Sequence, residues 1–186
     1  MGRTEADART RLQQAALTLF RDKGYEQTTA AQIAVEAGVT ERTFFRYFAD
    51  KREVLFGGEP VLRAALLEAL AAAPAGLGAL DLLFYAFRSV EALLDNNRAF
   101  SAPRQAIIAA HPALRERETA KLAALTDALT AALRARGIDD LPATLAAHAG
   151  MAAFVKATVA WIEDPALRLG ERFDAAFAAL KTLLNG

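Results

Sequence analysis

The sequence contains no cysteine and only two histidines, His111 and His148, among its 186 residues. Without thiols the chain can form neither disulfides nor thiolate metal sites, and a reducing cell interior is compatible with it. The two histidines do not form a metal-spaced cluster, and the sequence has no HExxH motif. It also has no glycine-rich phosphate-binding loop. We therefore expect neither a metal nor a cofactor.

Long apolar runs are missing as well. The N-terminus is charged rather than apolar, so it lacks the core of a signal peptide. The longest uncharged run, Leu141–Val155, is shorter than the roughly 20 residues that span a bilayer, and His148 interrupts it. These features predict a soluble cytoplasmic protein without a membrane partner.

The chain is rich in apolar, helix-forming residues. Hydrophobic residues make up 54% of it, which supports a substantial core, and alanine and leucine dominate. The net charge is zero. Residues 1–56 hold nine Lys or Arg and eight Asp or Glu, a balance of +1, which leaves thirteen and fourteen, a balance of −1, for the rest. The basic surplus is local to residues 40–52, which contain four basic and two acidic residues.

Residues 28–52 have the pattern of two short helices joined by a glycine turn. Thr28 or Thr29 can cap the first helix, and Gly38 allows the left-handed backbone that ends it. Thr40 can cap the second helix, so that Arg42 and its neighbours lie in the exposed first turn. A helix-turn-helix reads DNA bases with that end of its second helix.

A third helix is predicted over residues 4–23, ending at Gly24, because its apolar residues recur at helical spacing. The three helices together would make a small unit of about fifty residues. Its shared core is predicted to comprise Leu19, Phe20, Ile33, Val39, Phe44 and Phe48.

The run ALTLFRDKGYEQTTAAQIAVEAGVTERTFFRYFADKREVLF resembles the N-terminal DNA-binding domain of the TetR family of bacterial transcriptional regulators. The resemblance covers about the first fifty-six residues and keeps the order LF, KGY, TT, IA, AGV, YF, K, L. It implies an all-α fold of about nine helices. A helix-turn-helix DNA-binding domain, residues 1–56, would precede a larger effector-binding and dimerisation domain, residues 57–186.

The residues expected to contact DNA surround the predicted second helix. Arg42 suits the O6 and N7 atoms of guanine but could equally hold a phosphate. Tyr47 and Lys51 are expected to hold phosphates, as the matching positions do in the family. Phe45 replaces the family's usual tyrosine; it would pack on a thymine methyl or sugar, unless it only covers the neighbouring helix. The full predicted set is Thr28, Thr29, Thr40, Arg42, Thr43, Phe45, Arg46, Tyr47 and Lys51.

Every recognisable segment after Lys51 is helical in pattern. The cluster Gly57, Gly58 and Pro60 predicts a break or hinge. The later helices are predicted near residues 62–73, 77–95, 103–110, 112–136, 142–163 and from 165 or 166 to 184.

The last two predicted helices carry the expected self-association surface. The first has the small residues Ala146, Ala149, Gly150, Ala153 and Ala157 among Phe154 and Trp161, and the second has Phe173, Phe177, Leu180 and Leu184. The same pattern also fits an internal seam within one subunit. The resemblance favours a homodimer, whose two-fold symmetry suits a palindromic operator.

The predicted effector pocket combines polar residues with apolar walls. Each has an alternative structural role, in the core for Phe and Met, as a satisfied buried histidine for His148, or in ion pairs for Arg88 and Glu91. An apolar pocket with few polar anchors would suit a hydrophobic or aromatic effector. The predicted set is Phe84, Phe87, Arg88, Glu91, Arg104, His111, His148, Met151, Phe154, Thr158 and Trp161.

The function expected from these features is a ligand-responsive DNA-binding transcriptional regulator. We expect a repressor that binds double-stranded operator DNA as a homodimer and is released by a small-molecule effector. An alternative is a DNA-binding adaptor whose helical domain docks a protein partner. An enzyme is the least favoured class, because the chain has no HExxH, nucleophile elbow or cysteine.

Overall fold

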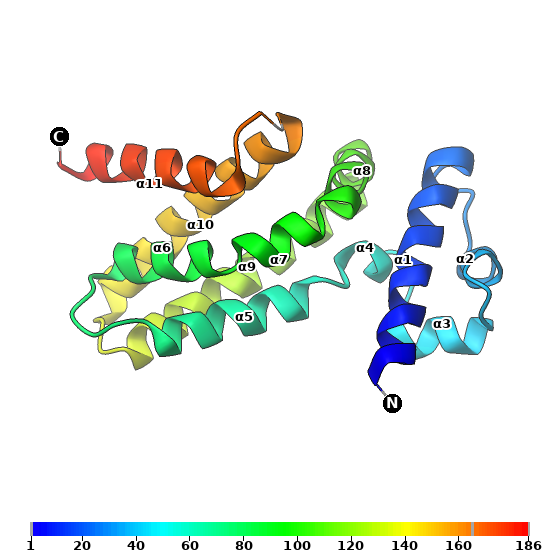
Figure 1. The fold of residues 1–186 in the computed structure, drawn as a ribbon, viewed down its shortest axis with the longest axis horizontal. Helices are drawn as coiled ribbons and strands as arrows, with labels where there is room; N and C mark the ends of the chain where they lie inside the picture. The colour runs from blue at the N-terminus through cyan, green and yellow to red at the C-terminus, as the bar shows by residue number, and fades with distance from the viewer. Residues whose placement is uncertain (1, 165, 186) are drawn as a thin grey trace. The chain divides into compact units, whose positions relative to one another are not determined.

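The computed structural model describes the backbone of residues 2–164 and 166–185 and the side chains of residues 8–164 and 166–183. All regular secondary structure in these residues is helical (Figure 1), which confirms the predicted all-α class. The helices are α1 (Gly2–Lys23), α2 (Ala30–Glu36), α3 (Glu41–Tyr47), α4 (Glu53–Phe56), α5 (Glu59–Ala72), α6 (Ala79–Ser89), α7 (Glu91–Asn96), α8 (Arg98–Ala110), α9 (Pro112–Ala135), α10 (Asp140–Glu163) and α11 (Leu169–Asn185).

The eleven helices of the described residues exceed the predicted nine because the short α4 forms a separate helix and one predicted segment is divided. The break at Gly57 and Gly58 separates α4 from α5, as the glycine cluster predicted. Val90, which leaves helical geometry at φ −95° and ψ 4°, separates α6 from α7 within the segment predicted as one helix.

The chain forms two compact units. The N-terminal unit comprises the chain up to Glu59 together with Ala99–Glu118, and the C-terminal unit comprises Pro60–Arg98 and the chain from Thr119 onward. Helix α9 therefore begins in one unit and continues in the other. We predicted two domains that are each contiguous in sequence, with a boundary after residue 56, and that boundary stays a prediction.

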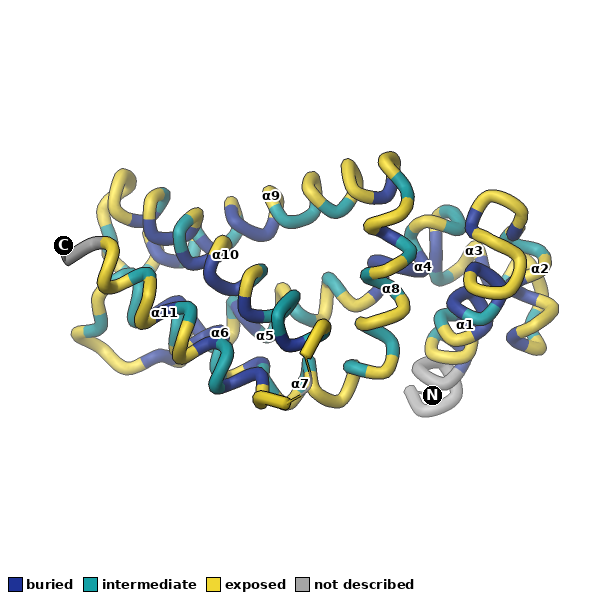
Figure 2. Tube along the Cα trace, turned by 90° about the horizontal axis from the view of Figure 1, so that it is seen from above, coloured by how far each residue is buried: buried dark blue, intermediate teal, exposed yellow. Residues whose placement is uncertain are grey.

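Helices α1, α2 and α3 enclose the core of the N-terminal unit, whose buried positions are dark blue in Figure 2. The predicted core is confirmed, with Ile33 and Phe44 fully buried and Val39 packed at its edge. The core also includes two residues from far along the chain, Ile108 of α8 and Leu114 of α9, both with 0% exposure.

Two glycines end helices where the sequence predicted. Gly24 (φ 86°) follows α1, and Gly38 (φ 66°) lies in the turn between α2 and α3. Positive φ is unfavourable for residues with a Cβ, so glycine is the residue suited to these positions. The turn is closed by backbone hydrogen bonds from Gly38 N to Val35 O (3.0 Å) and from Val39 N to Ala34 O (2.9 Å).

Helix α8 begins earlier than expected. We predicted a helix from about Pro103, but α8 starts at Arg98 and contains Pro103 as its sixth residue. Proline removes its own N–H from a helix and its ring crowds a carbonyl of the preceding turn, yet α8 continues through Pro103. Arg98, at the start, donates from Nη2 to Trp161 O (2.7 Å) and lies 4.7 Å from the Trp161 ring centroid, which anchors this end of the helix.

In the C-terminal unit α10 packs against both α6 and α11. Its core is an aromatic cluster in which Phe87 and Phe154 have ring centroids 4.6 Å apart and Phe154 and Phe173 stack at 5.5 Å. Gly150 allows the close approach of α6, because a Cβ there would lie 2.8 Å from Leu83 Cδ1.

The small-residue stripe of α10 belongs to this internal seam. Ala146, Gly150, Ala153 and Ala157 are buried within a single chain, and Ala149 is half-buried. On α11, Phe173 and Phe177 are likewise buried and Leu180 is partly buried; the Leu184 side chain lies outside the described residues. Our prediction that this stripe forms the self-association surface is therefore wrong. Periodicity identifies a buried face but not whether another helix of the same chain covers it.

Among the described residues, α10 is the one helix that is long and apolar enough to cross a membrane, judged by length and composition alone. The core helix of a soluble protein passes the same test. Nine residues of α10, including Met151 and Trp161, are buried inside the fold.

Replacing Phe87 with alanine should lower the free energy of unfolding by about 3–5 kcal/mol, because it opens a cavity in the aromatic cluster. The measurement is chemical denaturation monitored by circular dichroism. Tyr85→Ala, on the same helix but 41% exposed, is the control and should change it by less than about 0.5 kcal/mol. Equal losses for the two variants would contradict the assignment of Phe87 to the core.

Candidate functional site

Threonine side chains start both helices of the helix-turn-helix. Thr29 Oγ1 accepts from Gln32 N (3.2 Å) while Gln32 Oε1 accepts from Thr29 N (3.0 Å), a complete capping box for α2. Thr40 Oγ1 accepts from Thr43 N (3.2 Å) and lies 3.0 Å from Thr43 Oγ1. Thr29 and Thr40 are both exposed, so capping still leaves their side chains facing solvent.

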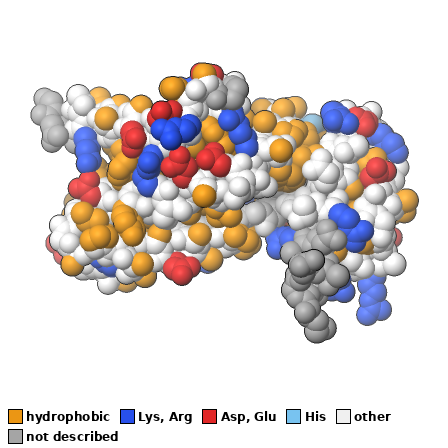
Figure 3. Space-filling view, viewed as in Figure 1, with side chains coloured by type: hydrophobic (Ala, Val, Ile, Leu, Met, Phe, Trp, Pro, Cys, Tyr) orange, Lys and Arg blue, Asp and Glu red, His pale blue; other side chains and the backbone are white. Residues whose placement is uncertain are grey.

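Helix α3 has a sharply divided surface. Phe44 is fully buried, whereas Phe45 is 51% exposed with its ring packed edge-to-face on Phe44 at 5.3 Å. Arg42 and Arg46 are exposed beside it. Figure 3 shows basic side chains projecting at lower right, over α3. The exposed face of α3 therefore presents an apolar ring together with two guanidinium groups.

Two half-buried residues complete the surface of α3. Tyr47 O–H accepts from Arg46 Nη2 at 3.2 Å, and the Arg46 guanidinium lies 5.0 Å from the Tyr47 ring centroid. Thr43 is half-buried and shares its hydroxyl contact with Thr40. Each hydroxyl oxygen keeps a further lone pair for a solvent or ligand donor.

Two residues that we predicted to contact DNA instead bind backbone carbonyls within the fold. Thr28 is 1% exposed, and its hydroxyl donates to Gly24 O (2.9 Å), with Leu19 O at 3.3 Å. Lys51 Nζ donates to the backbone carbonyls of Tyr25, Glu26 and Thr28. Both side chains are therefore engaged in joining α1 to α2 within the fold.

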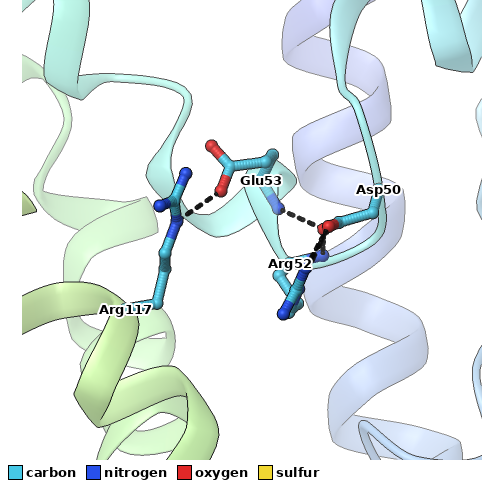
Figure 4. Close-up of polar contacts among 4 residues, drawn as sticks. All are labelled: Asp50, Arg52, Glu53 and Arg117. Atoms are coloured by element: carbon cyan, nitrogen blue, oxygen red, sulfur yellow. Dashed lines mark hydrogen bonds and ion pairs between the residues drawn. The ribbon is translucent and has the colours of Figure 1, made fainter. Parts of the chain in front are cut away.

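An acidic residue that was not among the predicted site residues precedes α4. Asp50 Oδ1 accepts from the backbone N–H groups of Arg52 (2.7 Å) and Glu53 (3.2 Å), and Asp50 Oδ2 pairs with Arg52 Nη2 at 2.6 Å (Figure 4). The Arg52 hydrogen bond holds the pKa of Asp50 below its ordinary value. An aspartate that accepts from backbone N–H groups two and three residues later forms an Asx turn, so Asp50 just before a helical segment was the available sequence signal.

Helix α4 is also tied to α8 and α9 within the N-terminal unit. Arg117 Nε pairs with Glu53 Oε1 at 2.8 Å (Figure 4), and Arg104 donates to Leu55 O at 2.6 Å and to Glu118 at 3.1 Å. Burial lowers the pKa of Arg104, an effect that Glu118 opposes. The partners are 14 to 64 residues apart, so no local pattern could have revealed them.

The predicted effector residues fall into separate places. Arg104 and His111 belong to the N-terminal unit, where the His111 ring lies 4.9 Å from that of Tyr25. His148 is exposed on α10, so the expectation that it is a buried histidine is wrong; its Nδ1 lies 2.9 Å from Thr144 O in the preceding turn. The remaining candidates lie in the C-terminal unit: Phe84, Phe87, Arg88, Glu91, Met151, Phe154, Thr158 and Trp161.

Most of these C-terminal candidates have internal contacts. The Thr158 hydroxyl donates to Phe154 O at 2.9 Å. Glu91 Oε1 accepts from Gly170 N at 3.0 Å, and Arg88 Nη1 lies 3.5 Å from Glu91 Oε2. A Cβ at position 170 would collide with the ends of the Arg88 and Glu91 side chains, so a larger residue there would displace both. Arg88 and Glu91 thus tie α6 and α7 to the start of α11.

A buried three-helix core, a glycine turn and an exposed basic face on the second helix define a helix-turn-helix DNA-binding protein. Comparison with known proteins narrows this class. Residues 12–56 match the family described as bacterial regulatory proteins, tetR family, and residues 77–185, more than half of the chain, match the MftR C-terminal domain, a TetR-type C-terminal domain. The chain belongs to the TetR family of transcriptional regulators, which are DNA-binding proteins and not enzymes.

Individual relatives agree with this assignment. The HTH-type transcriptional regulator TcmR from Streptomyces glaucescens is 45% identical over 82 residues, which cover 44% of this chain and 36% of TcmR. The chain thus matches about a third of that relative's length. Crystal structures of Thermus thermophilus FadR, a TetR-family repressor in complex with lauroyl-CoA, and of a Syntrophomonas wolfei regulator are also similar. Their sequence identities are 26% and 19%, and their TM-scores are 0.56 and 0.68. The FadR match covers 92% of both chains, and the other covers 97% of this chain and 96% of that one.

Asp50→Ala should lower the free energy of unfolding by about 1 kcal/mol near pH 7, because it removes the hydrogen-bond acceptor at the start of α4. The pKa of Asp50 is depressed in the folded state, so this stabilisation is present above the unfolded pKa of about 4 and is lost as pH falls through the folded pKa. Denaturant titrations across the acid range measure it.

The control is Asp127→Ala, which removes an exposed carboxylate from α9 and should change the free energy of unfolding by less than about 0.5 kcal/mol. A difference between Asp50→Ala and the unaltered protein that persists undiminished below about pH 2 would contradict the role of the Asp50 carboxylate.

Proposed function

We propose that the protein is a cytoplasmic transcriptional repressor that binds a palindromic DNA operator as a homodimer and is released by a small hydrophobic effector. The observation that carries the proposal is the exposed face of α3, where Arg42, Phe45 and Arg46 lie together above the buried Phe44. A helix seven residues long with this surface fits the major groove.

Each group on this face suits a different part of the duplex. Arg42, in the first turn of α3, reaches base edges and pairs with guanine through its planar fork. Phe45 cannot donate a hydrogen bond to a phosphate and instead packs on a thymine methyl or sugar. Arg46, Tyr47, Thr43 and the capping residues Thr29 and Thr40 bind backbone phosphates, which fix the register without reading sequence.

Dimerisation is proposed through the exposed side of α10 rather than through its small-residue seam. Leu141 and Leu145 are 68% and 62% exposed, and His148 and Ala152 continue the same stripe in solvent. Large apolar side chains in such a row are typical of an interface. A second copy of the chain is the proposed partner, because two α3 helices related by two-fold symmetry match a palindrome.

The effector is proposed to bind in the C-terminal unit and to be apolar. The aromatic side chains Phe84, Phe87 and Phe154 supply apolar walls there, and the relative FadR is described in complex with lauroyl-CoA, which carries an acyl chain. Release from DNA requires the effector to favour the non-binding conformation by about 100-fold, near 3 kcal/mol. The comparisons lend no support to the alternative of a docked protein partner.

Selection of bound duplexes from a randomised pool tests the proposal directly. The expected result is enrichment of an inverted repeat that binds two chains, and release of this duplex by acyl or aromatic compounds but not by polar metabolites of similar size. Failure to enrich any duplex at low ionic strength would overturn DNA binding, and enrichment of a site bound by a single chain would overturn the dimer.

Arg42→Ala should weaken binding to the selected duplex by about 1–3 kcal/mol for each half-site and abolish discrimination at one base pair of each half-site. Arg46→Ala is the comparison variant, because the loss of a phosphate contact weakens binding to all duplexes equally. Fluorescence anisotropy with single-base variants of the duplex measures both. If Arg42→Ala left the base preference intact, Arg42 would be a phosphate contact.

Leu145→Asp should convert the dimer to a monomer at micromolar concentration, because it places a charge in an apolar interface. Sedimentation equilibrium measures the change in mass. Val61→Asp, at a residue of α5 that is 52% exposed, is the matched control and should leave the dimer intact. A Leu145→Asp variant that stays dimeric would exclude this face of α10.

A further inference from the structure

The ammonium group of Lys51 is fully engaged inside the N-terminal unit. Nζ donates to Tyr25 O at 2.8 Å, to Thr28 O at 3.1 Å and to Glu26 O at 3.3 Å. An ammonium group has three N–H donors, and here each has a backbone carbonyl to bind. Lys51 itself is half-buried.

An aromatic ring also contacts the Lys51 ammonium group. Lys51 Nζ lies 4.4 Å from the centroid of the Tyr25 ring, within the range of a cation–π interaction. Tyr25 is 6% exposed, and its burial raises the pKa of its hydroxyl to about 12, so that the ring is a neutral phenol near pH 7. The attraction therefore comes from the face of the ring and not from a phenolate.

The carbonyls that bind Lys51 belong to the loop that starts the helix-turn-helix. This loop joins α1 to α2, and its last residue before the cap, Thr28, is buried and adjoins the capping residue Thr29. Lys51 follows α3. Its side chain thus ties the segment that precedes α2 to the segment that follows α3.

We propose that Lys51 is a positioning residue for DNA binding, which holds the α1–α2 loop and the start of α2 in place, rather than a residue that neutralises a phosphate. The proposal rests on the proposed DNA-binding function. To reach a phosphate, Nζ would have to break three hydrogen bonds, two of them part-buried, and leave the Tyr25 ring. Because these contacts order α2 and α3 before binding, less conformational entropy is lost when the protein binds the duplex.

The salt dependence of binding separates the two roles. Each phosphate neutralised by a protein cation contributes about 0.9 to the slope of log K against log salt concentration. Lys51→Met should weaken binding about tenfold through lost preorganisation and leave this slope unchanged. Arg46→Ala, at an exposed cation of α3, is the control and should lower the slope by about 1.8, because the dimer loses one phosphate contact in each subunit. A drop of that size for Lys51→Met would overturn the proposal.

Hydrogen exchange of the free protein gives a second readout. In Lys51→Met the amides of residues 25–30 should exchange faster, while those of α10 should not change, because the loop loses its tie and the C-terminal unit does not. Unchanged exchange in the loop would overturn the positioning role.

Labelling of the unaltered protein keeps the test independent of any variant that fails to fold. An amine-reactive reagent should modify Lys51 much more slowly than the exposed Lys23, and addition of the selected duplex should not change the Lys51 rate. Rapid labelling of Lys51 that DNA suppresses would overturn the proposal. A protein that binds no duplex would instead overturn the proposed function, whereas the exchange and labelling rates without DNA test the tie by themselves.

Discussion

Burial of Phe44 and Phe48 is the constraint on which the DNA-facing surface depends. Helix α3 has seven residues, and isolated helices shorter than about 12–15 residues are marginal in water. Its geometry therefore comes from packing: Phe44 is fully buried and Phe48 is 3% exposed, in a core shared with Leu12 and Ile33. With this inner side fixed, Arg42 and its exposed neighbours have one orientation relative to α2.

Local signals were sufficient to predict the helix-turn-helix. Threonine at the helix starts and glycine at positive φ act within a few residues of their own position, so Thr40, Gly24 and Gly38 could be assigned from sequence. The cap of α2 was narrowed to Thr28 or Thr29, and the structure shows Thr29. The outward orientation of Phe45 followed from helical periodicity. The core of the N-terminal unit was predictable for the same reason, because apolar residues at helical spacing form a helix face that must be buried against other helices.

What covers a face, and what a charged group binds, could not be predicted. The alanines and Gly150 of α10 have the spacing of a dimer interface and of an internal seam alike, and contacts with α6 and α11 decide between them. Lys51 is similar: its charge suggested a phosphate, whereas carbonyls more than twenty residues earlier bind it. Arg104 and Arg117 reach α4 across still longer sequence separations. Such pairings are set by the tertiary fold, which periodicity does not encode.

The presence of Ile108 and Leu114 in the N-terminal core determines whether the helix-turn-helix region could fold without the rest of the chain. Both side chains are fully buried, and both come from the segment Ala99–Glu118. Proteolytic excision of the first 56 or so residues would leave the hydrophobic partners of these two residues in contact with water, at roughly 25 cal/mol for each Å² of apolar surface exposed. The helix-turn-helix is contiguous in sequence, but the N-terminal unit whose core stabilises it is not.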